Sequence, residues 1–153
     1  MGLYGTKLET TTGYDNRWLR SSFGHDAGLP VTLKLDAFPT AVGATQAATK
    51  DDDGTVHIPA GIPLAAKAPN GSWLNAEHKY VPYLGDAATQ VLAGFLKVTI
   101  DIPSGYTGEV SGALLYATVV RVAHLPFAFA GKVTLADVKA GNLIAVLEYN
   151  EAL

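Results

Sequence analysis

The chain has 153 residues, of which 48% are hydrophobic and only 16% charged, and its formal net charge is −3. A chain of this length forms one domain with its own core, and a mildly acidic chain lacks the basic surface that nucleic-acid binding needs. The absence of cysteine excludes disulfides, thiolate metal sites and cysteine nucleophiles. So few charges favour a protein that assembles with others rather than a free enzyme.

The first 27 residues carry large apolar side chains that follow neither the helical period nor the strand period. We predict an extended N-terminal arm over residues 1–27 that becomes ordered on a partner, followed by one β-rich domain over residues 28–153. Purely disordered tails are usually poor in aromatics. A frayed terminus is the alternative. The candidate anchors of the arm are Leu3, Tyr4, Tyr14, Trp18 and Phe23.

The first half of the predicted domain reads as strands and loops. Alternating apolar residues over 31–36 predict a half-buried strand, and residues 39–55 are typical of a loop. Residues 56–66 are apolar but contain Pro59 and Pro63, which cannot donate ladder hydrogen bonds. We therefore expect an edge strand or a bent strand there.

Two glycines mark turns or bulges in the middle of the chain. Asn70-Gly71 predicts a hairpin over residues 64–75 with a type I′ turn, because both residue types tolerate positive φ. The next apolar segment fits a helical stripe at its start, but its strict alternation further on favours a long strand from about Val91 to Ile102. Gly94 marks a bulge or a close approach within that strand.

The last third of the chain continues the β-rich pattern. A strand-forming run extends from Gly112 through Val122, and Leu143 to Leu147 form a last strand. Between them, Thr134 can cap one helical turn over residues 135–140. The fold class that we predict is mostly β, a small barrel or sandwich with a short helical turn.

No constellation predicts an enzyme, a cofactor or a metal site. The four histidines, His25, His57, His78 and His124, lack the spacing that puts two imidazoles on one helix face. Residues 51–54 resemble half of a calcium loop, but Thr49 and Ala60 would stand at ligand positions that need a carboxylate. The serine elbow and the glycine-rich nucleotide loops are missing. No apolar run is long enough to span a membrane, and no export signal is recognised, so we expect a soluble protein made in the cytoplasm.

One region resembles a known family. Residues 58–64 read Ile-Pro-Ala-Gly-Ile-Pro-Leu and lead into the Asn70-Gly71 turn and Ser-Trp-Leu at 72–74. Residues 84–96 read Leu-Gly-Asp-Ala-Ala-Thr-Gln-Val-Leu-Ala-Gly-Phe-Leu. This order resembles the lambda-type head decoration (capsid-stabilising) proteins of tailed bacteriophages. The resemblance implies a β-rich domain with a flexible N-terminal arm that sits as a trimer on the outside of an expanded capsid, at local three-fold positions, and is not an enzyme.

The expected function is therefore that of a structural virion protein, located on the outer surface of the capsid, that cements capsomers. Its expected partners are the major capsid protein, to whose sheet edge the arm would add, and two copies of itself. Because residues 112–130 carry one charged side chain, we expect the subunit contact near residues 120–130, at Arg121, Leu125, Phe127 and Phe129. The alternative is a carbohydrate- or receptor-binding module of a virion fibre, with Trp73 as its candidate sugar contact.

Overall fold

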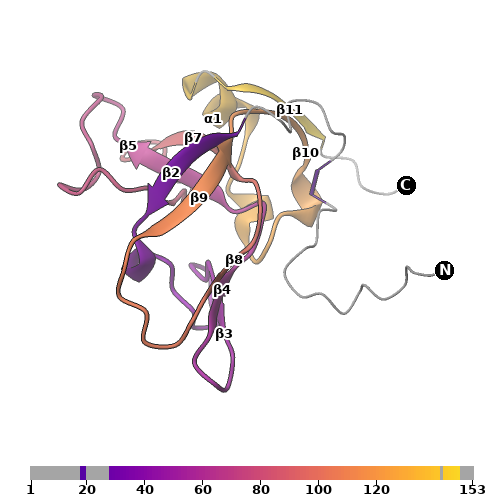
Figure 1. The fold of residues 1–153 in the computed structure, drawn as a ribbon. Helices are drawn as coiled ribbons and strands as arrows, with labels where there is room; N and C mark the ends of the chain where they lie inside the picture. The colour runs from indigo at the N-terminus through magenta and orange to yellow at the C-terminus, as the bar shows by residue number, and fades with distance from the viewer. Residues whose placement is uncertain (1–17, 20–27, 142, 149–153) are drawn as a thin grey trace.

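A computed structural model describes residues 18–19, 28–141 and 143–148. The predicted mostly β fold is confirmed, with one short helix (Figure 1). The main sheet has five strands in the order β2-β9-β7-β5-β6. These strands are β2 (Leu29–Leu33), β9 (Val110–Leu115), β7 (Val91–Leu96), β5 (Pro63–Lys67) and β6 (Val81–Pro82).

The main sheet is antiparallel throughout and curls until its two edges meet. The contact between the edges is made by Tyr80, the residue before β6. Its amide donates to the carbonyl of Thr32 at 2.8 Å, and the amide of Lys34 donates to the carbonyl of Tyr80 at 2.9 Å. Hydrogen bonds across this seam give the sheet the barrel-like shape that the strand pattern predicts.

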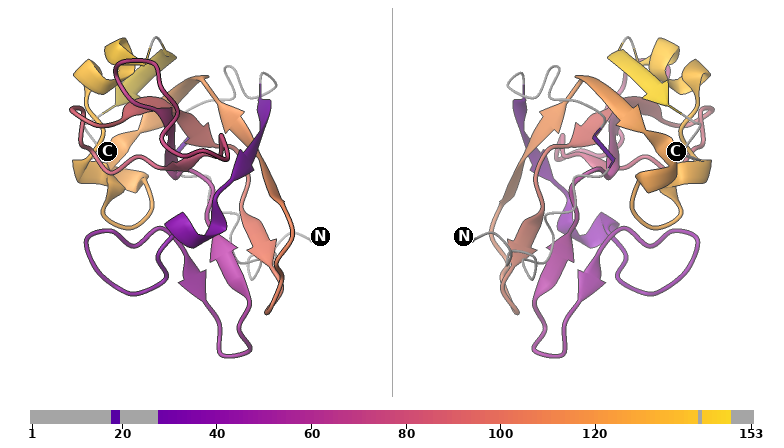
Figure 2. Two further views of the ribbon diagram at one scale, coloured as in Figure 1. Left: turned by 90° about the vertical axis from the view of Figure 1, so that its left-hand side faces the viewer. Right: turned by 90° about the vertical axis from the view of Figure 1, so that its right-hand side faces the viewer.

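Two smaller sheets flank the main one. The first has the order β3-β4-β8, with β3 (Thr49–Lys50), β4 (Val56–Ile58) and β8 (Ile100–Ile102). Figure 2 shows the β3–β4 hairpin projecting from the lower end of the molecule. The second pairs β10 (Ala117–Arg121) in parallel with β11 (Ile144–Glu148).

The chain between β10 and β11 contains two short 3₁₀ turns, at Val122–His124 and Phe129–Gly131, and the helix α1 (Leu135–Ala140). The predicted cap of α1 is confirmed. Thr134 and Asp137 form a capping box, and Gly141 follows the last helical residue. The predicted last strand is confirmed as β11.

Of the two alternatives for residues 56–66, the edge strand is wrong, because β5 lies between β7 and β6 inside the sheet, while the expected bend is present. The segment is divided into β4 and β5 by a turn at Gly61, whose φ is +95°. Pro63 is the first residue of β5, where a missing amide hydrogen interrupts no ladder.

The predicted hairpin at Asn70-Gly71 is confirmed, but the type I′ turn is wrong. The amide of Gly71 donates to the carbonyl of Ala68 at 2.9 Å, and the amide of Ala68 donates to the carbonyl of Ser72 at 2.8 Å. Gly71 has a φ of +89°, whereas Asn70 is not among the residues with positive φ. This pattern is a three-residue loop, a type I turn followed by a glycine bulge, which suits Pro69 at the second turn position.

The strand predicted from Val91 begins there, but it ends at Leu96 rather than at Ile102. The chain leaves the main sheet over residues 97–99 and then joins the β3-β4-β8 sheet as β8. Gly94 is confirmed as a bulge and a close approach, because a Cβ atom at this position would lie 2.4 Å from the carbonyl oxygen of Leu115.

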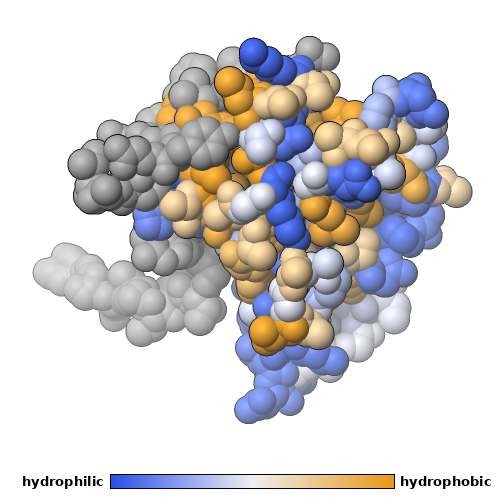
Figure 3. Space-filling model, turned by 180° about the vertical axis from the view of Figure 1, so that it is seen from behind, coloured by the Kyte–Doolittle hydropathy of each residue, from blue (hydrophilic) through white to orange (hydrophobic). Residues whose placement is uncertain are grey.

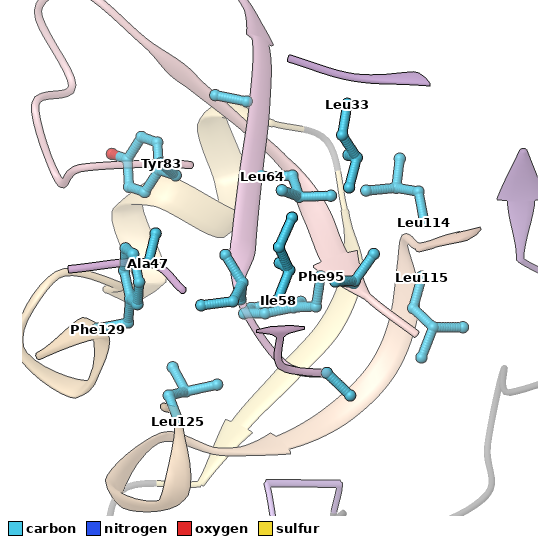
Figure 4. Packing of buried hydrophobic residues seen from close by; sticks show 14 of the residues in the cluster. Leu33, Ala47, Ile58, Leu64, Tyr83, Phe95, Leu114, Leu115, Leu125 and Phe129 are labelled. Atoms are coloured by element: carbon cyan, nitrogen blue, oxygen red, sulfur yellow. The ribbon is translucent and has the colours of Figure 1, made fainter. Parts of the chain in front are cut away.

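The core lies inside the curl of the main sheet and continues beneath the segment that carries α1. Figure 4 shows it extending from Leu33 and Leu114 on one side, through Leu64 and Phe95, to Phe129 on the other side.

Candidate functional site

Trp18, predicted to anchor the arm on a partner, lies in the core of the domain itself. Its side chain is 1% exposed, and its ring stacks on Phe95 with the centroids 6.0 Å apart. A Cβ atom at Gly61 would lie 2.9 Å from the indole, so the indole fits only because residue 61 has no side chain. The prediction that Trp18 contacts a partner is therefore wrong.

The backbone around Trp18 also belongs to the domain. The carbonyl of Trp18 accepts a hydrogen bond from the amide of Arg121 at 2.7 Å, and Leu19 forms an antiparallel bridge with Val120. The structure thus places residues 18–19 with the domain rather than with the arm. The other predicted anchors, Leu3, Tyr4, Tyr14 and Phe23, lie outside the described residues.

The predicted subunit contact is not one exposed surface. Leu125 is 4% exposed and Phe129 is 0% exposed, so both belong to the core and their assignment to a contact is wrong. The 3₁₀ turns fold this segment back onto the main sheet, and the second layer that its apolar residues need comes from the same chain. Phe127 is half-buried with a φ of +54°, and Arg121 is half-buried on β10.

His57 lies between two carboxylates on the β3-β4-β8 sheet. Its Nδ1 is 2.5 Å from Oδ1 of Asp101, the residue opposite it on β8, and its Nε2 is 2.7 Å from Oδ2 of Asp51. Both carboxylates can be satisfied only by an imidazolium, which donates from both nitrogens. The hydrogen bonds to Asp101 and Asp51 accordingly raise the pKa of His57 above its usual 6.5.

This arrangement stabilises the small sheet, but it does not suit proton transfer. Each ring nitrogen already faces a carboxylate, so neither is directed at a substrate. The strand pattern around residue 57 indicates that His57 lies on a strand. That Asp101 stands opposite His57 follows only from the register of β4 with β8. Within the described ranges, no group of three His, Cys, Asp or Glu side chains could hold a metal ion.

Trp73, the candidate sugar contact, lies beside the hairpin with other side chains against its ring. The His78 ring stacks on it at a centroid distance of 4.5 Å and an angle of 15°, and Lys67 Nζ lies 5.0 Å from its centroid. Stacking by His78 covers a flat face that a sugar ring would use.

Tyr83 and Asp137 form a buried pair that ties the chain after β6 to α1. The Tyr83 hydroxyl donates to Oδ1 of Asp137 at 2.5 Å, while Oδ2 accepts from the amide of Thr134 at 2.8 Å. Burial, followed by the hydrogen bond to Asp137, raises the pKa of Tyr83 far above its usual value of 10. The donors and acceptors of this pair satisfy each other, so the pair is structural.

An apolar hollow of about 330 Å³ opens at the end of the main sheet where β2 and β7 begin and β5 and β9 end. We call it the apolar mouth. It is lined among others by Leu29, Lys67, Tyr80, Val91, Leu114 and Tyr116. A second hollow, of about 250 Å³, lies at the other end of β2 and is bordered by Lys34, Glu77 and Lys79. Lys34 already pairs with Glu77 at 2.9 Å there.

Comparison with known proteins gives no relative: no family model, curated protein or solved structure matches this chain. Among the residues that the structure describes, none of the helices is long and apolar enough to cross a bilayer.

Proposed function

We propose that this protein is a structural component of a bacteriophage virion that binds the outer surface of the capsid and stabilises the contacts between neighbouring capsomers. The resemblance to lambda-type head decoration proteins supports this proposal. The residues that carry the resemblance, about 56–100, supply three strands of the curled main sheet and the central strand, β4, of the β3-β4-β8 sheet.

The observation that carries the proposal is the position of Trp18. Its burial against Phe95 and over Gly61 joins the N-terminal segment to the domain at one fixed point. The 17 residues before it include Leu3, Tyr4 and Tyr14. A segment of that length reaches at most about 60 Å when fully extended, far enough to contact a neighbouring capsomer.

In this proposal, residues 1–17 supply binding to the capsid and the domain supplies a rigid block to which they are attached. Main-chain hydrogen bonds to a sheet edge of the major capsid protein would give affinity, and Tyr4 and Tyr14 would act as side-chain anchors. A protein that binds only the assembled shell shifts the equilibrium away from disassembly.

The proposed trimer needs a contact made by exposed side chains, because Leu125 and Phe129 are buried. Exposed large apolar residues are available on several sides of the described domain. They are Leu29, Val42, Trp73, Leu84, Val98, Tyr106 and Leu135.

The test is co-sedimentation with expanded empty capsids of the phage whose genome encodes this chain. Double replacement of Tyr4 and Tyr14 by Ser should abolish binding and leave the thermal midpoint unchanged. Replacement of Thr10 and Thr12 by Ser is the matched control, since it changes two residues of the same segment without removing an aromatic ring, and this variant should bind normally. Full binding by the double tyrosine variant would refute the role of the arm.

A further inference from the structure

The apolar mouth is lined mainly by apolar side chains. Figure 3 shows one face of the domain, on which apolar and hydrophilic side chains are interspersed over the upper part while hydrophilic ones dominate the lower tip. Leu29, at the rim of the mouth, is 48% exposed, while Leu114 and Leu92 deeper in it are buried. Apolar hollows of this size at the end of a curled sheet are typical binding sites for one side chain or a small ligand.

Among the described residues that line the mouth, Lys67 is the only charged one. Lys34 and Lys79 pair with Glu77 and Glu109, but no carboxylate of the described part of the chain lies within ion-pair distance of Lys67. Its ammonium group lies over the ring of Trp73 instead. A positive charge without a counterion at the rim of an apolar hollow favours a ligand with an acidic group.

Two phenol hydroxyls add to this preference. Tyr80 and Tyr116 line the mouth, and in the described ranges neither hydroxyl has a hydrogen-bond partner. Burial raises the pKa of Tyr80, which keeps its hydroxyl protonated and able to donate. The mouth therefore combines an apolar interior with hydrogen-bond donors and a cation, the complement of an apolar group next to a carboxylate.

Addition of a strand to β2 beside the mouth is blocked. The carbonyl of Thr32 already accepts from Tyr80 across the seam, so the main-chain groups of Thr32 point away from β9. By the two-residue period of a strand, those of Pro30 point the same way, and proline has no amide hydrogen to donate. A ligand of the mouth would therefore be recognised by groups that enter it rather than by continuation of the sheet.

We propose that the apolar mouth binds an extended segment of a partner protein, taking up one leucine-like side chain while an acidic side chain two residues away pairs with Lys67. Residues i and i+2 of an extended segment lie on the same side, which brings both groups to the mouth together. This inference goes beyond the proposed function, because it defines a second contact that is independent of residues 1–17.

The test is titration of the isotope-labelled full chain with blocked peptides, followed by two-dimensional amide NMR. The probe is acetyl-Gly-Leu-Gly-Glu-Gly-amide, compared with the same peptide carrying Lys in place of Glu and with one carrying Ser in place of Leu. We expect saturable shifts at Leu29, Ala93 and Tyr116 with the first peptide, and binding at least about fivefold weaker for the other two.

Variants of the protein separate the two contributions. Lys67→Gln should weaken the acidic peptide about fivefold and remove the preference for Glu over Lys, whereas Lys50→Gln, on β3 away from the mouth, should change neither. Tyr116→Phe keeps the ring and removes the hydroxyl, and we expect it to bind the acidic peptide about threefold more weakly.

Three outcomes would overturn the proposal. The first is chemical shifts that do not saturate, and the second is an unchanged preference of Lys67→Gln for the Glu peptide over the Lys peptide. The third is saturable binding of octanoate in place of the peptides, which would make the mouth a site for small amphipathic anions. Self-association of the wild type that Lys67→Gln abolishes in sedimentation would assign the mouth to a second copy of the chain.

Discussion

Replacement of Trp18 by Ala is the most informative single change in the domain. The indole is 1% exposed, so the variant loses nearly all of its buried area together with the stacking on Phe95. Truncation of a buried tryptophan to alanine costs about 3–5 kcal/mol, a large share of the roughly 5–15 kcal/mol that stabilise a typical domain. For a chain of this size, we expect the thermal midpoint to fall by roughly 10 °C or more.

Calorimetry or circular dichroism of matched variants checks this expectation. Trp18→Phe keeps an aromatic ring against Phe95. It also removes the indole Nε1–H, which has no hydrogen-bond partner within the described residues. The thermal midpoint of Trp18→Phe should therefore fall by less than half as much as that of Trp18→Ala. Deletion of residues 1–17 should leave the midpoint nearly unchanged, whereas deletion of residues 1–19 should lower it as Trp18→Ala does. An unchanged midpoint in Trp18→Ala would show that the indole is not part of the core.

Three further predictions concern other parts of the domain. His57→Gln removes a pair of ionic hydrogen bonds whose carboxylates are half exposed, at a cost of about 1 kcal/mol. Because the pKa of His57 is raised in the folded state, this contribution is fully present below pH 6.5 and is lost as the pH rises through that pKa, so urea unfolding should separate the two proteins at about pH 5.5 and not at about pH 9. Gly71→Val, at a φ of +89° with open space around it, should cost about 1–2 kcal/mol in urea, while Gly43→Val, in open space without a positive φ, should cost little. Phe129→Asp should prevent folding, as judged by loss of near-ultraviolet circular dichroism, because the side chain is fully buried, and a folded Phe129→Asp protein would make this residue a contact candidate again.

Features with a local cause were predictable from the sequence. The capping box of α1 depends on residues three positions apart, and the hairpin depends on adjacent turn residues, so both are readable without knowledge of the fold. The bulge at Gly94 was also readable, because a glycine within a strand pattern usually marks a bulge or a close approach of another backbone segment.

Features that depend on long-range pairing were not predictable. Trp18 has no periodic neighbours, and its burial follows from a surface made by Gly61 and Phe95, more than forty residues further along the chain. The carboxylates around His57 come together only through the register of β4 with β8 and the turn after β3. The burial of Phe129 was not readable because it depends on the core cluster, most of whose members lie far from it in the sequence.

We propose that the protein stabilises an assembled capsid by binding to its outer surface. The most direct measurement is the temperature at which expanded empty capsids disrupt, followed by light scattering and electron microscopy, with increasing amounts of the full chain added. We expect this temperature to rise and then to saturate at one trimer per local three-fold position, and we expect the chain lacking residues 1–17 to have no effect. Saturable binding without any rise, or an equal rise with the truncated chain, would contradict this proposal.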